Sequence, residues 1–414
     1  MIQGGIMAHT NNDEDIQVLS SQVHDNYEPK KITDNDDDKD AKTKTQQFIN
    51  QILDAENLLV LAGSGTSLTF NSSPKKVAPS MWNLWEACSS LTNFDSILEI
   101  VKYSAVAEKD LEGEEKKDIE LLLSLCDAYL PLKNLLDEDQ KRVRNFLNEA
   151  KETILQKTNF VDQVPLESWD AHNNFIRTLG RRSPKQQRLK LFTTNYDLAF
   201  EKAASNTGMI VIDGFEFSNP ANFNPAWFQY DIVNRAQNNA YLSNVFQLYK
   251  LHGSVDWNKS SSIVQKINIQ NGSLPRDPVF IYPSSSKYQV SYDSPYLDMI
   301  SAFLESVQKP KTALICIGFG FNDKHLNNAI TMALRTNPEL MLLIVTMDPF
   351  NSKGSFSADI REKLTRAITA GDSRIMIIDS KFDNFSLKML PNRHTQSPEE
   401  KLLASFSQIL EGSI

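Results

Sequence analysis

The sequence predicts an α/β protein with a Rossmann-like, mostly parallel sheet, and two observations support this fold class. Short apolar runs recur along the chain, and several of them are followed by segments with helical spacing. The apolar runs lie at 57–63, 189–195, 209–214, 245–253, 279–283, 312–320, 341–348 and 374–380. Apolar strands that alternate with helices are typical of a sheet whose two faces are both covered by helices.

The helices that are expected between these strands follow from the spacing of their apolar residues. Residues 48–56 have this spacing ahead of the first strand, 197–206 follow the second strand, and 323–336 follow a later one. Between about 84 and 188 no comparable strand is predicted, and 119–155 have the spacing of two or more helices. We therefore expect a helical insertion at about 84–188 that either covers a functional site or forms an oligomer surface.

The composition divides the 414 residues into three parts. Residues 1–44 form an acidic tail, because positions 11–41 hold ten acidic and three basic residues while the whole chain has a net charge of −9. Such a segment has too little apolar surface to offset the entropy of ordering it, so we expect it to be disordered, or ordered only against a partner. Residues 45–385 form the α/β domain, and 386–414 form a C-terminal extension with a helix.

The same composition excludes several classes of protein. Three cysteines (Cys88, Cys126 and Cys316) are too few for a disulfide scaffold or for a four-cysteine zinc site within one chain. Outside the acidic tail the chain is close to neutral, and no basic excess indicates direct binding of nucleic acid. The chain shows neither a secretory signal nor a long apolar run, so we expect no membrane association and a cytoplasmic location.

The first motif with chemical meaning is the turn that follows the strand at 57–63. Its residues are Gly63, Ser64, Gly65, Thr66 and Ser67. Glycines at the end of a buried strand allow a ligand to approach the backbone closely, and α/β sheets hold pyrophosphates at such turns. The spacing departs from the dinucleotide fingerprint of three glycines, so an ordinary strand-to-helix turn is an equal alternative.

The second and third motifs end the strands at 189–195 and 245–253. Asn195 and Asp197 lie at the carboxyl end of one strand, where open α/β sheets bind ligands, although Asp197 can also cap the next helix. His252 ends the other strand just before Gly253, and a histidine in such a place can act as a general base near neutral pH. The alternative for His252 is a structural histidine with satisfied hydrogen bonds.

The fourth motif follows the strand at 312–320. Gly318, Phe319 and Gly320 precede a helix that Asp323 is expected to cap. These residues form either a second glycine-lined wall for a dinucleotide or a simple turn.

The four motifs, taken together and in this order, resemble those of the sirtuin family. Sirtuins carry a glycine-rich loop, a polar strand end with an asparagine, a catalytic histidine followed by glycine, and a later glycine turn. Here the corresponding segments are 63–67, 193–197, His252-Gly253 and 318–320, and the resemblance covers roughly residues 46–380.

The resemblance implies that residues 45–385 bind NAD and that the enzyme cleaves it. It implies that Asn195 orients the ribose or the attacking water and that His252 accepts a proton. The loop at 63–67 is expected to hold the pyrophosphate through its backbone N–H groups, and the turn at 318–320 is expected to contact the adenosine side. Asp197 is expected to shape the nicotinamide pocket.

Several departures from the family pattern narrow the expected activity. Thr194 replaces the usual glutamine, residues 69–85 replace the segment that normally follows the glycine loop, and a four-cysteine zinc module cannot be built. These features are similar to those of the sirtuin-like proteins of bacterial phage-defence systems, which hydrolyse NAD. Among them, the chain looks most like the subunit that is paired with a HerA-type ATPase.

The resemblance therefore implies an NAD hydrolase without zinc that acts in antiviral defence by depleting NAD. Because a free NAD hydrolase is toxic to its host, we expect control by homo-oligomerisation or by an ATPase partner. The alternatives are an NAD-dependent protein deacylase, a sensor that binds NAD or ADP-ribose without turnover, and a structural subunit with a vestigial site.

Overall fold

The fold is described here from a computed structural model of the chain. It describes residues 16–23, 28–32, 39–72, 76–107, 109, 113–132, 137–183, 186–269, 274–280, 294–351, 354 and 356–391.

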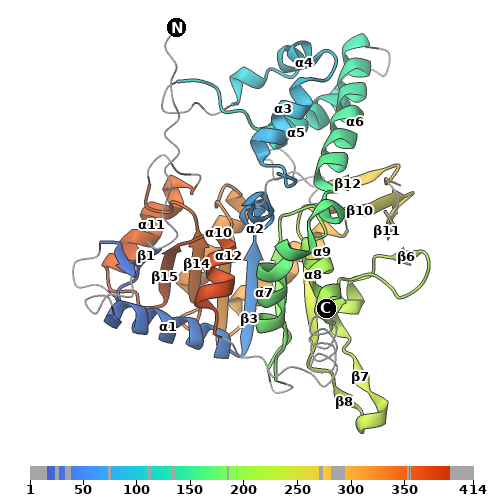
Figure 1. Ribbon diagram of the computed structural model, residues 1–414. Helices are drawn as coiled ribbons and strands as arrows, with labels where there is room; N and C mark the ends of the chain where they lie inside the picture. The colour runs from blue at the N-terminus through green and yellow to red at the C-terminus, as the bar shows by residue number, and fades with distance from the viewer. Residues whose placement is uncertain are drawn as a thin grey trace, which may run out of the picture.

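A nine-stranded sheet forms the centre of the molecule, with the strand order β2-β1-β15-β14-β13-β3-β4-β9-β5 (Figure 1). Seven neighbouring strands of this sheet are parallel. They are β3 (Asn57–Ala62), β4 (Lys190–Thr193), β5 (Ile210–Ile212), β9 (Val245–Lys250), β13 (Thr312–Ile317), β14 (Met341–Thr346) and β15 (Ile375–Asp379). The predicted α/β class with a mostly parallel sheet is confirmed, and seven of the eight predicted apolar runs supply these strands.

The order of the strands creates a switch point at the centre of the sheet. From β3 the chain continues to β4 on one side, whereas from β13 it continues to β14 on the other side. The two strands run in register from the pair Asn57 and Thr312 to the pair Ala62 and Ile317, so both end at the same level. Open α/β sheets bind their ligands beyond the carboxyl ends of the strands at such a point.

Helices cover both faces of the sheet, because side chains alternate between the faces along each strand. In β3, Leu58 and Val60 belong to one apolar core and Leu59 and Leu61 to the other. The first face is covered by α1 (Lys39–Asp54), α7 (Asp170–Gly180), α8 (Ala199–Asn206), α12 (Phe382–Asn384) and a π-helical turn (Phe385–Met389). The second face is covered by α9 (Tyr296–Gln308), α10 (Lys324–Thr336) and α11 (Ala358–Thr369).

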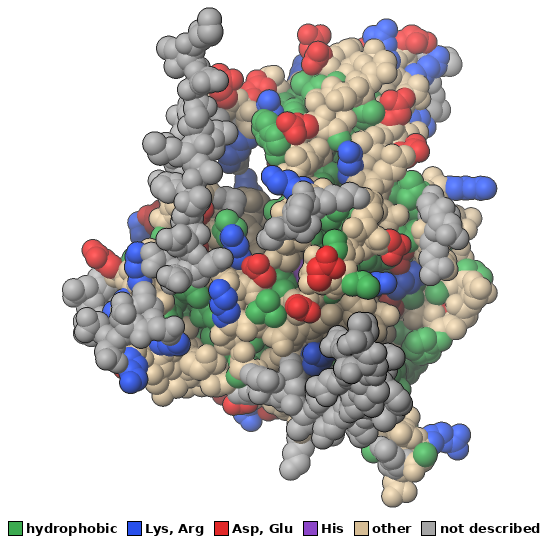
Figure 2. Space-filling model, in the orientation of Figure 1, with side chains coloured by type: hydrophobic (Ala, Val, Ile, Leu, Met, Phe, Trp, Pro, Cys, Tyr) green, Lys and Arg blue, Asp and Glu red, His purple; other side chains and the backbone are tan. Residues whose placement is uncertain are grey.

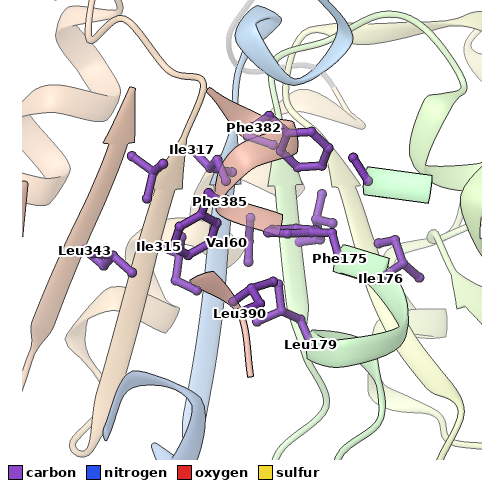
Figure 3. Close-up of a cluster of buried hydrophobic side chains, with 14 of the residues drawn as sticks. Val60, Phe175, Ile176, Leu179, Ile315, Ile317, Leu343, Phe382, Phe385 and Leu390 are labelled. Carbon is purple, nitrogen blue, oxygen red and sulfur yellow. The ribbon is translucent and has the colours of Figure 1, made fainter. Parts of the chain in front are cut away.

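The first core brings the end of the described chain onto the sheet. Figure 3 shows Val60, Ile315 and Ile317 of the central strands facing Phe175 of α7 and Phe385 of the π-helical turn. The last described residues are therefore part of the α/β domain. The predicted extension of 386–414 therefore begins too early, because Leu390 still packs in the first core, and residues 392–414 lie outside the described residues.

The helical insertion has an apolar core of its own above the carboxyl ends of the central strands (Figure 1). It contains α3 (Met81–Ser89), α4 (Phe94–Ile100), α5 (Ile119–Tyr129) and α6 (Glu138–Thr158). The predicted limits of 84–188 are too wide, because α7 packs on the sheet through Phe175, Ile176 and Leu179 and belongs to the α/β domain. The insertion thus ends with α6.

A separate, small antiparallel sheet has the strand order β12-β10-β11-β6. Its strands are β6 (Ala221–Asn222), β10 (Gly253–Ser260), β11 (Ile263–Lys266) and β12 (Pro278–Phe280), and β7 (Val233–Asn234) pairs with β8 (Ala240–Tyr241) apart from it. The run at 279–283 was predicted as a strand of the parallel sheet, and this is wrong, because β12 pairs antiparallel with β10.

The prediction of a disordered tail over residues 1–44 is also wrong for the part of it that the structure describes. Strand β1 (Ile16–Leu19) pairs antiparallel with β15, and β2 (Lys30–Ile32) pairs with β1 at the edge of the sheet. Val18 is fully buried and Leu19 is 2% exposed. The three apolar residues of β1 (Ile16, Val18 and Leu19) are enough to add an edge strand, although the average composition of the region is polar.

The surface agrees with a nearly neutral body. Among the described residues on the face in Figure 2, acidic and basic side chains are interspersed and no broad area of one sign forms. No helix within the described part of the chain has the length and apolar character that are needed to cross a membrane.

Candidate active site

A cavity of about 190 Å³ lies at the switch point of the sheet, between the carboxyl ends of the strands and the insertion. Its polar lining comes from Ser64, Ser67, Asp118, Glu120, Thr158, Thr194, Asn195, Tyr196, Asp197, His252, Asn322 and Asp323. Pro79, Met81, Leu84, Phe160 and Phe319 supply its apolar lining, and Gly63 and Gly320 supply backbone. The insertion therefore covers the site, which was one of the two roles expected for it.

The two glycine turns that follow β3 and β13 are packed backbone against backbone. A Cβ atom on Gly63 would lie 2.6 Å from the carbonyl oxygen of Gly318, and one on Gly65 would lie 2.6 Å from the Cα of Gly318. The N–H of Gly63 donates to Ile317 O at 3.0 Å, and the N–H of Gly65 donates to Gly318 O at 2.9 Å. These two N–H groups, which were assigned to a pyrophosphate, are thus engaged within the protein, and the glycines allow the two turns to touch.

Asn195 joins its own strand end to the first glycine turn. Its Nδ2 donates to Gly63 O at 3.1 Å, to Thr66 Oγ1 at 3.0 Å and to Ser67 Oγ at 2.9 Å. The side chain is held because Asn195 is only 8% exposed and all three acceptors lie on one turn. Since Nδ2 is fully used, the side-chain oxygen Oδ1 is the atom with which Asn195 can accept a hydrogen bond from water or a hydroxyl group.

Asp197 has two structural partners. Its Oδ2 accepts a hydrogen bond from Ser67 Oγ at 2.6 Å, and its Oδ1 accepts one from the N–H of Ala199 at 2.9 Å. The second bond satisfies the N–H of the first residue of α8, but the N-cap position of this helix is Leu198, so the prediction that Asp197 is the cap is wrong. The first bond extends the chain of hydrogen bonds from Asn195 through Ser67 to a carboxylate on the cavity wall.

His252 forms a buried pair with Asp323. Its Nε2 lies 3.3 Å from Asp323 Oδ2, and the two side chains are among the buried polar residues. Burial by itself lowers the pKa of His252, but the hydrogen bond with Asp323 and the charges of Glu120 and Asp323 outweigh it, so that the pKa is raised. Burial is the largest influence on the pKa of Asp323 and raises it, but the hydrogen bond and charge of His252 and the N–H groups of Leu326 and His325 together outweigh burial, so the pKa is lowered.

Asp323 serves a second purpose as the N-cap of α10. Its Oδ1 accepts hydrogen bonds from the N–H groups of His325 at 2.8 Å and Leu326 at 3.1 Å. One oxygen of the carboxylate is thus fixed by the helix, and the other is presented to His252. The cap was predicted from the sequence, whereas the contact with His252 was not.

A buried lysine supports the loop that carries Asn195. Lys250 ends β9 and is 3% exposed, and its Nζ donates to the carbonyl oxygens of Tyr196, at 3.1 Å, and of Asp197. Nζ also lies 3.4 Å from Glu201 Oε1. This side chain therefore ties the strand that leads to His252 to the loop that holds Asn195.

The structure brings most of the predicted site residues to one cavity. Those that line it are Gly63, Ser64, Ser67, Asn195, Asp197, His252, Phe319 and Gly320. Gly65, Thr66 and Gly318 lie behind the lining and hold the two turns together. Sequence reasoning missed Asp118 and Glu120, because nothing in the local pattern of the insertion shows that α5 reaches the site. It also missed Tyr196 and Asn322, although both lie next to predicted residues.

No group of three or more histidine, cysteine or acidic residues within the described part of the chain is placed to hold a metal ion. The three cysteines are each buried and free, and they lie in α3, α5 and β13. The donor set of a zinc module is therefore not assembled from these thiols.

Comparison with known proteins agrees with the expected family. Residues 189–367 match the SIR2-like domain, and this segment contains Asn195, His252 and Asp323. No curated protein matches the chain. Among solved structures, cytosolic 5′-nucleotidase IIIB bound to cytidine is 9% identical over 90% of this chain and 93% of its own, with a TM-score of 0.29, which is too low to support an argument.

The fold defines an α/β protein in which residues 189–367 are similar to the SIR2-like domain. Asn195 and His252 lie in this matched segment, and residues of the insertion complete the cavity that they line.

Proposed function

We propose that this protein is an NAD glycohydrolase, which converts NAD and water to nicotinamide, ADP-ribose and a proton. One observation carries the proposal: the His252–Asp323 pair and Asn195 meet in one covered cavity at the switch point of the sheet. The SIR2-like match supports NAD as the substrate.

The chemistry of the bond suits a cavity with this charge. When the bond between nicotinamide and ribose breaks, the electron pair goes to the nicotinamide nitrogen and positive charge builds on the ribose, as in glycoside hydrolysis. Carboxylates stabilise such a charge, and Asp118, Glu120, Asp197 and Asp323 line the cavity. The insertion supplies one wall of the cavity, and protein in place of water on that side strengthens these interactions.

His252 acts in the proposal as the general base. Because Nε2 donates to the Asp323 carboxylate, the neutral ring carries its lone pair on Nδ1. That nitrogen accepts a proton from a ribose hydroxyl or from the attacking water, and Asp323 stabilises the imidazolium that forms. Asn195, fixed through Nδ2, offers Oδ1 to the same water or hydroxyl.

The experiment measures nicotinamide release from NAD by the purified chain without any peptide. We expect release by the wild type, and losses of roughly 100-fold or more in His252→Ala and Asn195→Ala. His325→Ala, an exposed histidine on α10, serves as the matched control and should keep full activity. Wild-type rates in both site variants would refute the assignment.

The same assay separates the alternatives. Release that requires an acylated peptide would identify a deacylase. Tight binding of NAD with no product over hours would identify a sensor, and neither binding nor turnover would leave a structural subunit.

We further propose, from the resemblance to the phage-defence proteins, that the chain acts in the cytoplasm as a homo-oligomer with a HerA-type ATPase and depletes NAD on infection. Light scattering of the purified chain, alone and mixed with a candidate ATPase, tests both assemblies. Cellular NAD that stays constant during phage challenge in cells with the wild-type chain and its partner would contradict the defence role.

A further inference from the structure

Glu120 is the acidic side chain that α5 of the insertion directs to the cavity. It is the second residue of the helix that Asp118 caps, and both residues line the cavity. Its Oε1 accepts a hydrogen bond from the hydroxyl group of Tyr196 at 3.4 Å. Tyr196 directly follows Asn195, so this contact connects the insertion to the loop that carries the central asparagine.

The electrostatic setting of Glu120 links it to His252. Burial raises the pKa of Glu120 to about 7, against the opposing effect of the His252 charge. In return, the charge of Glu120 is one of the causes that raise the pKa of His252. Two carboxylates therefore act on the histidine, Asp323 from the α/β domain and Glu120 from the insertion.

We propose that Glu120 is a positioning residue through which the helical insertion sets the electrostatic field at His252 and holds Tyr196 over the cavity. This inference rests on the proposed function for its effect on turnover, but its effect on the histidine is independent of any substrate. Glu120 acts through His252 and Tyr196.

The other titratable groups around the histidine are fixed in place. Asp323 caps α10, Asp118 caps α5 and Asp197 serves the start of α8, so each is tied to a helix by its own backbone bonds. The ring of Tyr196 lies 6.4 Å from that of His252, and Tyr296 on α9 interacts with the Asp323 charge. Glu120 differs from Asp323 and Asp197 because its helix belongs to the separate core of the insertion. It differs from Asp118, on the same helix, because its charge is one of the causes that raise the pKa of His252.

The test replaces Glu120 by glutamine, which keeps the size and the acceptor for Tyr196 but removes the charge. Histidine NMR titration of the full chain, with the His252 signal assigned through His252→Ala, reports the pKa of His252 without any substrate. We expect that pKa to fall by at least about 0.5 in Glu120→Gln, because a nearby negative charge stabilises the imidazolium. Glu149→Gln, on an exposed turn of α6, is the matched control and should leave it unchanged.

Turnover supplies a second readout. If His252 must be neutral to act, the acid limb of kcat/KM for nicotinamide release should move to lower pH in Glu120→Gln and stay in place in Glu149→Gln. An unchanged His252 titration in a folded Glu120→Gln protein would overturn the inference. A shifted titration without any NAD cleavage by the wild type would instead retain the inference about the field and refute the proposed function.

Discussion

Asp323 uses one carboxylate oxygen to cap α10 and the other to bind His252, so the start of a helix and the candidate base share one side chain. The cap fixes the carboxylate on the α/β domain, and the carboxylate fixes the imidazole. This arrangement separates a structural contribution of Asp323 from an electrostatic one, and the two can be measured by different substitutions.

Asp323→Asn should keep the cap and lose the charge, because asparagine caps helices as well as aspartate does. We expect nearly wild-type thermal stability, a roughly 10- to 100-fold loss of turnover, and an acid limb of the rate profile at lower pH. Asp323→Ala should lose about 1 kcal/mol of folding free energy in addition. Equal stability losses in the two variants, measured by thermal denaturation, would contradict the division of roles.

Gly318→Ala should destabilise the fold at the contact between the two glycine turns. Gly318 has a φ of +56°, and a Cβ there would lie 2.6 Å from the N of Thr66. Strain and overpacking together predict a loss of roughly 3 kcal/mol or more in the free energy of unfolding.

Gly371→Ala is the control for Gly318→Ala. Gly371 has a φ of +92° and open space around its Cα, so only the backbone strain of roughly 1–2 kcal/mol applies. Denaturant unfolding of both variants measures the difference, and equal losses would show that the turns are not in close contact.

Lys250→Met should disturb the loop of Asn195 without touching the cavity directly. The substitution removes the Nζ donor from the carbonyl oxygens of Tyr196 and Asp197. Tyr196 O keeps the N–H of Val255, so the loss falls mainly on Asp197 O, and a buried unpaired acceptor costs about 1–3 kcal/mol. We expect lower thermal stability together with lower turnover. Lys157→Met, at an exposed position in the last turn of α6, should change stability by about 0.5 kcal/mol or less. A Lys250→Met protein as stable and active as this control would show that the lysine does not support the loop.

His172 should make the fold sensitive to acid. It is fully buried on α7, its ring stacks on Phe70 at 4.3 Å, and neither ring nitrogen has a hydrogen-bond partner. Burial lowers its pKa to about 3, so the unfolded chain binds a proton at this residue below about pH 6.5 while the folded chain does not.

His172 therefore has no effect on the pH dependence of the unfolding free energy above about pH 6.5. As the pH falls from 6.5 toward 3, protonation of His172 in the unfolded chain lowers that free energy progressively. At pH 5 the loss amounts to about 2 kcal/mol relative to pH 7.5. His172→Phe keeps an aromatic ring in this cluster and removes the titration. The unfolding free energy of that variant should fall less between pH 7.5 and pH 5, and an identical fall would show that other groups control acid stability.

The strand ends of the site were predictable from the sequence because parallel strands end at one edge of the sheet. Thr193 of β4 lies opposite Lys250 of β9, so the residues that follow, including Asn195 and His252, emerge side by side. Apolar runs of the right length and the polar residues after them contain this information.

The role of Glu120 was not predictable in the same way. It lies 76 positions before Tyr196, and the two meet only because the insertion folds back over the sheet. The strands of the N-terminal region escaped prediction for another reason: the apolar segment of β1 is short, and its pairing with β15 depends on a strand more than 300 positions later. The local composition of a segment does not show which distant strand it pairs with.

Because the insertion has its own apolar core, the cavity lies at the boundary between two separately packed parts of the molecule. The core of α3 to α6 takes in few side chains of the α/β domain, among them Tyr196 and Val255 next to the site. A protein that binds the outer surface of the insertion and moves the insertion relative to the α/β domain would act as a noncompetitive effector. It would change the maximal rate of the reaction, and no excess of NAD would reverse the change.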